Sequence, residues 1–125
     1  MNLGDVYIWE TESVQGHDKR KKRHVFICPE DSDDANIFLF INKQDWYGDY
    51  KILKSNYEQF LEYDSFVGCN SIVTYTSDYL RNVSIQLVGQ ITNQDLKGIR
   101  DAIIAAETME RRHANKVCKA LAAAL

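Results

Sequence analysis

The chain has 125 residues, which suits one domain rather than two. With 45% hydrophobic and 26% charged residues, its composition is that of a globular protein and excludes a disordered chain. No apolar run reaches the roughly 18 residues that a membrane-spanning helix needs, and the first ten residues lack the basic and apolar regions of a secretion signal. The three scattered cysteines, Cys28, Cys69 and Cys118, suit reduced thiols better than a disulfide framework. We therefore expect a single cytoplasmic domain that makes no use of a membrane.

The formal net charge of −3 hides an uneven distribution of charge. Five of the fifteen Lys and Arg residues are consecutive, at positions 19–23, and the rest of the chain has ten basic against eighteen acidic residues, a net charge of −8. A positive segment of this kind attracts and holds a polyanion whatever the total charge is. A solvated loop, or a loop that binds an acidic peptide, explains the block equally well.

Short strand-like runs of β-branched and aromatic residues fill the first half of the chain. They predict strands over residues 6–9, 24–28 and 36–42. The third run is apolar at every position from Ile37 to Ile41, so both of its faces should be covered, one by the interior of the domain and the other by a helix or a second subunit. Residues 10–22 are polar and show no hydrophobic period, which predicts a long loop.

The second half continues with short runs and ends in a helical pattern. Further strands are predicted over residues 50–53, 65–67, 71–75 and 83–91, and a helical turn over residues 57–61 with Ser55 as its cap. Thr92 followed by Asp95 has the spacing of a helix N-cap, and from Leu96 onward apolar residues recur every three or four positions. Because residues 107–116 interrupt this stripe, residues 93–125 should form two packed helical segments or one protruding helix.

Many short strands followed by helix, without strand–helix–strand alternation, predict the fold class. We expect a mainly β (α+β) domain spanning residues 1–125: a small antiparallel barrel with an extended C-terminal helix from about residue 93.

Several segments of the chain stand in a recognisable order. They are residues 4–9 (GDVYIW), 16–17 (GH), 23–27 (RHVFI), 37–42 (IFLFIN), 61–72 (LEYDSFVGCNSI), 88–91 (VGQI) and 95–103 (DLKGIRDAI). In this order and spacing, from about residue 3 to residue 106, the chain resembles the PemK/MazF family of bacterial toxin endoribonucleases. The resemblance implies an SH3-like barrel that dimerises through its sheet and cuts single-stranded RNA without a metal or other cofactor. It also implies a cognate antitoxin that silences the protein.

Two positions depart from the family pattern. His24 stands where the family commonly has Pro, and Asn42 stands where it carries a catalytic Thr or Ser. An amide does not relay a proton as a hydroxyl does, so Asn42 is expected to hydrogen-bond a phosphate oxygen or a base edge instead. The chain also extends some 19 residues past the usual closing helix. An alternative interpretation is a catalytically degenerate barrel that binds RNA or protein. A third interpretation is an interaction protein, a barrel whose extra C-terminal helix docks a partner.

Metal-free RNA cleavage requires a stabilised phosphorane and a proton-transfer group. At the position that the resemblance matches, Arg23 carries a guanidinium that can fork onto two phosphate oxygens. His17, beside Gly16 in the predicted loop, is the candidate for proton transfer. Adjacent strand residues point to opposite faces, so His24 should not share a site with Arg23 and is expected to be a half-buried strand histidine. The candidate catalytic residues are Arg23, Asn42 and His17.

The candidate RNA-binding residues are cationic or aromatic. Lys19, Arg20, Lys21, Lys22 and Lys43 are expected to contact phosphates, and Trp46 and Tyr47 to stack on unpaired bases. The structural alternatives are a solvated edge-strand residue for Arg23, strand-end residues for Asn42 and Lys43, a solvated charged loop for the basic block, and an aromatic cap on the barrel for Trp46 and Tyr47. The three histidines have no partner at zinc-ligand spacing, so no metal site is expected.

Overall fold

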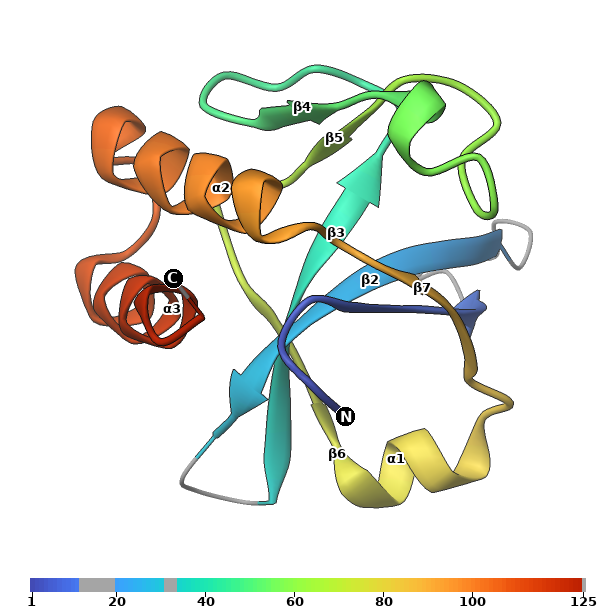
Figure 1. Cartoon of the computed structure of the whole chain (residues 1–125). Helices are drawn as coiled ribbons and strands as arrows, with labels where there is room; N and C mark the ends of the chain where they lie inside the picture. Colours follow the sequence, from blue (N-terminus) through green and yellow to red (C-terminus); the bar gives the residue numbers. More distant parts are fainter. Residues whose placement is uncertain (12–19, 31–33, 125) are drawn as a thin grey trace.

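The structure is a computed structural model that describes residues 1–11, 20–30 and 34–124, with the side chains of Thr11 and Arg20 outside the description. Strands dominate the first two thirds of the described chain and helices the last third (Figure 1). The elements are β1 (Asp5–Thr11), β2 (Arg20–Pro29), β3 (Ala35–Asn42), β4 (Tyr50–Ile52), a 3-10 helix (Lys54–Asn56), β5 (Ser65–Val67), β6 (Val73–Thr76), α1 (Ser77–Asn82), β7 (Gln86–Gln90), α2 (Asn93–Ala106) and α3 (Arg111–Ala122).

The described strands form one antiparallel sheet that curves into a half-barrel. Its order is β4-β5-β3-β2-β1-β7, and β6 also pairs with β3. The long strand β3 pairs with two strands along the same edge, with β6 through residues 35–38 and with β5 through residues 41–42. This architecture confirms the predicted fold class, a mainly β, barrel-like domain of the α+β type with helices at its C-terminus.

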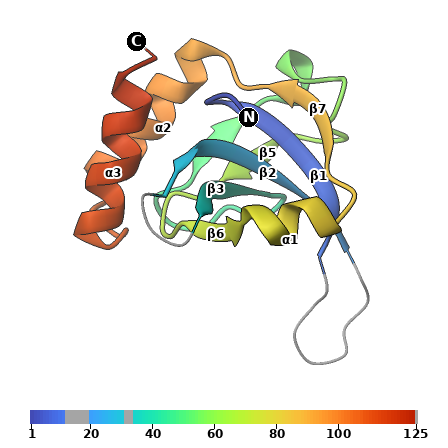
Figure 2. The same ribbon diagram turned by 90° about the horizontal axis from the view of Figure 1, so that it is seen from below.

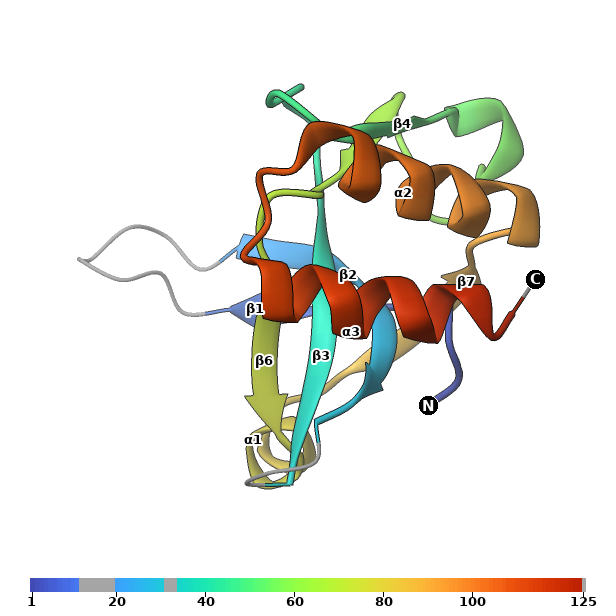
Figure 3. The ribbon, with the colours of Figure 1, turned by 90° about the vertical axis from the view of Figure 1, so that its left-hand side faces the viewer.

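The main hydrophobic core lies between one face of the sheet and the two C-terminal helices. Figure 3 shows α3 crossing in front of β2 and β3, while α2 runs beside β4. Side chains of alternate residues on the central strands fill this core, among them Val25, Leu39 and Ile41. They meet Ile99 and Ile103 of α2 and Val117 and Leu121 of α3, all of them buried.

A second, aromatic core lies on the opposite face of the same strands. It contains Tyr7, Trp9, Phe26, Phe38 and Leu80. Leu80 belongs to α1, which lies on a different side of the sheet from α2 and α3 (Figure 2). The prediction that both faces of β3 are covered is thus confirmed, and within one chain it is a helix that helps to cover the second face.

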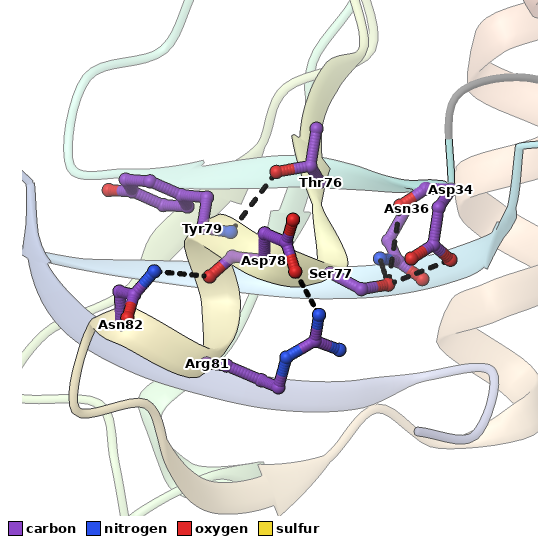
Figure 4. A network of polar contacts seen from close by, with 8 residues as sticks. All are labelled: Asp34, Asn36, Thr76, Ser77, Asp78, Tyr79, Arg81 and Asn82. Atoms are coloured by element: carbon purple, nitrogen blue, oxygen red, sulfur yellow. Dashed lines mark hydrogen bonds and ion pairs between the residues drawn. The ribbon is translucent and has the colours of Figure 1, made fainter.

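The helix α1 has no counterpart among the sequence predictions, and its caps explain why it forms. The hydroxyl of Thr76 accepts a hydrogen bond from the backbone N–H of Tyr79 at 3.1 Å (Figure 4). The buried Asn36 of β3 donates to the Tyr75 carbonyl at 3.3 Å and to the Ser77 hydroxyl at 3.2 Å. Six residues are too few for a stable isolated helix, so this one depends on its N-cap and on its attachment to β3.

The prediction of a loop over residues 10–22 is wrong at both ends, because both flanking strands extend into this range. β1 continues to Thr11 and β2 begins at Arg20, so most of the basic block belongs to a strand. Cross-strand pairing overrides the polar composition, since Glu10 stands opposite Lys21 in the register and Trp9 opposite Lys22. Opposite charges at facing strand positions make such a polar strand end tolerable.

Other predicted elements are confirmed in part. The last strand is confined to Gln86–Gln90. The turn predicted over residues 57–61 is present, since the backbone N–H groups of Phe60 and Leu61 both donate to the Tyr57 carbonyl, but a 3-10 helix at Lys54–Asn56 precedes it and Ser55 provides no side-chain cap.

The C-terminal region consists of two packed helices, which confirms one of the two arrangements predicted for it and corrects the single extended helix from about residue 93. Glu107 ends α2 in a left-handed conformation (φ 55°), and its N–H bonds the Ile103 carbonyl. Among the described residues, no helix has the length and apolar character to cross a bilayer.

Candidate nucleic-acid interface

The first residues of β2 and the last residues of β3 frame a pocket of about 440 Å³. The register brings this about, because Arg23 pairs with Ile41 and the chain leaves the sheet directly after Asn42. We call it the basic–aromatic pocket. Its described lining is Lys21, Lys22, Arg23, Ile41, Asn42, Lys43, Gln44, Trp46 and Tyr63. Four of the described lining residues are cationic, and none of the nine carries a carboxylate.

Arg23 is anchored by one end of its guanidinium. Its Nε donates a hydrogen bond of 2.6 Å to the carbonyl of Phe60. Since that bond engages Nε, the two terminal nitrogens remain available to fork onto an anion. No carboxylate of the described residues forms an ion pair with Lys21, Arg23 or Lys43. Lys21, Arg23 and Lys43 therefore bring positive charge to the pocket without an ion pair to a described carboxylate, although Glu10 faces Lys21 in the strand register.

Lys22 and Asn42 touch each other across the pocket. The Lys22 Nζ lies 3.4 Å from Asn42 Oδ1 and 4.2 Å from the centroid of the Phe40 ring, a cation–π contact. The contact joins the end of β2 to the end of β3. It also engages the amide oxygen of Asn42, so the NH₂ of that amide is the group left to meet an acceptor on a ligand.

The aromatic residues after β3 sit on a tight turn. Trp46 accepts a backbone hydrogen bond of 3.0 Å from Asp49, and Gly48 takes a positive φ of 86°, as the third position of a type II turn requires. A Cβ on Gly48 would approach the Cβ of Ala106 to 2.8 Å, so only glycine fits between this turn and the end of α2. The Trp46 ring remains 59% exposed and lines the pocket.

His24 lies on the other face of β2, within the aromatic core. It is fully buried and stacks on Trp9 with ring centroids 3.8 Å apart. Its Nδ1 donates to the Lys22 carbonyl at 3.1 Å, so Nε2 is the acceptor of the Tyr75 hydroxyl at 3.2 Å. Burial lowers the pKa of His24 to about 4, and the nearby charge of Lys22 acts in the same direction. The neutral ring is a structural element, as expected of a strand histidine, although its burial is complete.

The structure brings together six of the ten predicted site residues. Lys21, Lys22, Arg23, Asn42, Lys43 and Trp46 all line the basic–aromatic pocket. Tyr47 follows Trp46 but does not line this pocket, and its side chain is 77% exposed. His17 and Lys19 lie outside the described residues, and of Arg20 only the backbone is described, at the start of β2.

Sequence reasoning missed three lining residues. Ile41, Gln44 and Tyr63 complete the pocket, and Tyr63 is 46% exposed. Ile41 and Gln44 are close in sequence to predicted residues and were within reach of a search of that segment. Tyr63 comes from the loop before β5, and only the pairing of β5 with β3 brings this loop to the pocket. No local sequence pattern indicates that Tyr63 lies at the pocket.

The arrangement suits anion binding and ring stacking. Cationic side chains and the Asn42 amide supply hydrogen-bond donors for phosphate oxygens, and exposed aromatic rings supply surfaces for flat groups. Within residues 1–11, 20–30 and 34–124, no group of three or more His, Cys, Asp or Glu residues is placed to hold a metal ion. No protein-family model matches this chain, and no curated protein matches it either, so its resemblance to the PemK/MazF family remains a prediction.

Proposed function

We propose that this protein binds single-stranded RNA in the basic–aromatic pocket. The observation that carries the proposal is the convergence of Lys21, Arg23 and Lys43 around Asn42 without a carboxylate among the described lining residues. Phosphodiesters are the common biological ligand for such a cluster, because each cation that contacts a phosphate releases a condensed counterion. An overall charge of −3 does not oppose this, since the field near the pocket is set by its own cations.

The aromatic residues favour a single strand over a duplex. Trp46 and Tyr63 expose their rings beside the cations, and an exposed ring can stack only on a base that is free of its own neighbours. A paired helix would present its phosphates but keep its bases stacked internally. The choice of RNA over single-stranded DNA rests on the resemblance to PemK/MazF endoribonucleases.

A second candidate function is metal-independent cleavage of the bound RNA. The observation that favours it is the anchored guanidinium of Arg23, whose Nε is held by the Phe60 carbonyl while its terminal nitrogens are available for a phosphorane. Cleavage also requires a proton acceptor for the 2′-hydroxyl. The described lining contains no His, Asp or Glu, and the predicted candidate, His17, lies outside the described residues. Binding is therefore the better supported of the two functions.

A toxin role, neutralisation by a cognate antitoxin and a homodimer are proposals that rest on the resemblance alone. The structure adds one restriction to the dimer. Both faces of β3 are covered within one chain, by α2 and α3 on one side and by the aromatic core on the other. A second subunit would thus use a sheet edge or a helix surface rather than a face of β3.

The proposal is tested by comparing a single-stranded decaribonucleotide with the same sequence held in a duplex. Fluorescence anisotropy of a labelled strand, titrated with purified protein in about 50 mM salt, gives both affinities. We expect the single strand to bind at least tenfold more tightly, because its bases can reach the aromatic rings. Equal affinities would show that only phosphates are contacted, and absence of binding to both would remove the function.

A further inference from the structure

A second, smaller pocket adjoins the basic–aromatic pocket. It has a volume of about 290 Å³, close to the lower end of the roughly 300–1,000 Å³ that small-molecule sites enclose. Asn42 and Trp46 line both pockets. The remaining described lining residues of the second pocket are Phe40, Asp49, Gly68, Asn70 and Ser71. Because the two pockets share walls, a strand whose phosphates contact the basic–aromatic pocket can place a neighbouring base in the second pocket.

The second pocket differs in charge from the basic–aromatic pocket. None of its described lining residues is cationic, and Asp49 carries a carboxylate. A phosphate in this pocket would be repelled by that carboxylate, whereas an uncharged ring would not. The Trp46 ring, which is 59% exposed, supplies a surface on which such a ring can stack.

Gly68 lines the second pocket, and neither its backbone nor its packing requires a glycine. Its φ is not positive, so an L side chain fits the backbone. A Cβ at this position would lie 3.6 Å from the Asn42 Nδ2 and 3.6 Å from the Phe40 carbonyl oxygen, which are ordinary contacts. Both atoms belong to other lining residues, so a side chain at position 68 would stand among the walls of the pocket.

The other described glycines each have a structural reason to be glycine. Gly4 and Gly48 have positive φ angles of 88° and 86°. At Gly89 and Gly98, a Cβ would come within 2.8 Å and 2.3 Å of an aromatic ring. Gly68 has no such reason, although glycine loses more conformational entropy on folding than any other residue. The fold therefore does not explain the room that Gly68 leaves in the pocket.

We propose that the second pocket holds one base of the bound RNA strand and that Gly68 leaves the space for the ring of that base. The inference rests on the proposed RNA binding and adds a base subsite to it. A side chain at position 68 would take up part of the pocket and keep the base from its place against Trp46.

Gly68→Ala tests the proposal because its effects on stability and on binding should have opposite signs. Alanine should keep or raise the urea midpoint of unfolding, since it restricts the unfolded chain without straining the folded one. The same variant should bind a single-stranded RNA decamer of mixed sequence on the order of tenfold more weakly than wild type, through the loss of one stacked base. Circular dichroism gives the midpoints and fluorescence anisotropy the affinities.

A fully abasic decamer, which keeps the phosphates and lacks every base, is the control ligand. Wild type and Gly68→Ala should bind it equally, because the cations of the basic–aromatic pocket are the same in both. Ser71→Phe is a second variant, which adds a ring to an exposed residue that lines the second pocket but not the basic–aromatic pocket. It should show the same selective loss, while Ser84→Phe, at an exposed serine outside both pockets, should bind like wild type.

Wild-type affinity of Gly68→Ala and Ser71→Phe for the mixed-sequence decamer overturns this inference while leaving RNA binding in place. An equal loss of affinity for the abasic decamer also overturns it, because the effect would then not depend on a base. A lower urea midpoint for Gly68→Ala would show that the fold itself requires the glycine, which contradicts the inference. Failure of wild type to bind either decamer overturns the proposed function and this inference with it.

Discussion

Arg23 and His24 are neighbours in the chain, yet their side chains lie in opposite compartments of the protein. Arg23 lines the basic–aromatic pocket and donates to the Phe60 carbonyl, whereas His24 is buried against Trp9. The alternation of a regular strand produces this separation. It assigns ligand contact to the guanidinium and leaves the imidazole, with its pKa lowered to about 4, as a neutral part of the core.

The first prediction concerns Arg23 and the cleavage candidate. Loss of a guanidinium that stabilises a phosphorane should lower the cleavage rate on the order of 100-fold or more. Arg23→Ala should therefore cut a labelled single-stranded RNA far more slowly than wild type, and should relieve growth arrest when expressed without an antitoxin. Arg81→Ala, at an exposed arginine of α1, is the matched control. Cleavage by Arg23→Ala at the wild-type rate would place the reactive site elsewhere.

The second prediction is a pH dependence of stability caused by His24. In the folded protein its pKa is about 4, against an ordinary value near 6.5 in the unfolded chain. Below pH 6.5 the unfolded state therefore binds a proton that the folded state refuses, so stability falls as the pH falls toward 4. Between pH 7 and pH 5 this group alone should lower the free energy of unfolding by about 2 kcal/mol.

Urea denaturation at pH 7 and pH 5 measures this dependence. The loss should be about 2 kcal/mol smaller in His24→Gln, which cannot be protonated. His17 and His113 are present in both proteins, so their contributions cancel in the comparison. An identical loss in wild type and His24→Gln would mean that the imidazole is not excluded from water.

The third prediction separates the two cores. Phe38→Ala should lower the free energy of unfolding by about 3–5 kcal/mol by opening a cavity in the aromatic core, and Leu39→Ala by about 2–5 kcal/mol in the main core. Leu87→Ala, at a leucine of β7 that is 55% exposed, should change it by less than about 0.5 kcal/mol. Denaturant unfolding followed by circular dichroism provides the three values. A small effect at either buried position would show that its face of β3 is not covered.

The fourth prediction distinguishes two neighbouring aromatic residues. Trp46 lines the pocket and Tyr47 does not. Trp46→Ala should therefore weaken single-stranded RNA binding by about 1–3 kcal/mol, the usual loss for one stacked base, while Tyr47→Ala should leave the affinity nearly unchanged. Equal losses for both variants would mean that the bases lie over the outer side of the turn instead.

Much of the fold was within reach of the sequence because its signals are local. The hydrophobic run of β3, the Thr92 N-cap and the apolar stripe of the C-terminal region each report an element directly, and their order indicates a small antiparallel sheet. The elements that the sequence did not predict depend on partners that are distant in sequence. The polar start of β2 becomes a strand through pairing with β1, and α1 forms because Asn36 and Thr76 hold its first turn.

The residues of the candidate site likewise divide into those that a local sequence signal indicates and those that only distant pairing brings into place. Arg23, Asn42 and Lys43 lie near the ends of two predicted strands, so an antiparallel pairing was enough to suggest their proximity. Tyr63 has no such signal, because it reaches the pocket only through the pairing of β5 with β3.

The salt dependence of RNA affinity tests the central claim most directly. Each phosphate contact with a single strand contributes a slope of about −0.7 to the logarithm of the affinity against the logarithm of salt concentration. Wild-type protein should therefore lose affinity steeply between about 50 and 200 mM salt, and the double variant Lys21→Ala/Lys43→Ala should bind more weakly with a slope shallower by about 1.4. Lys97→Ala/Lys119→Ala removes the same charge from exposed positions of α2 and α3 and should keep the wild-type slope. An affinity independent of salt, or equal slopes for the two double variants, would contradict RNA binding in the basic–aromatic pocket.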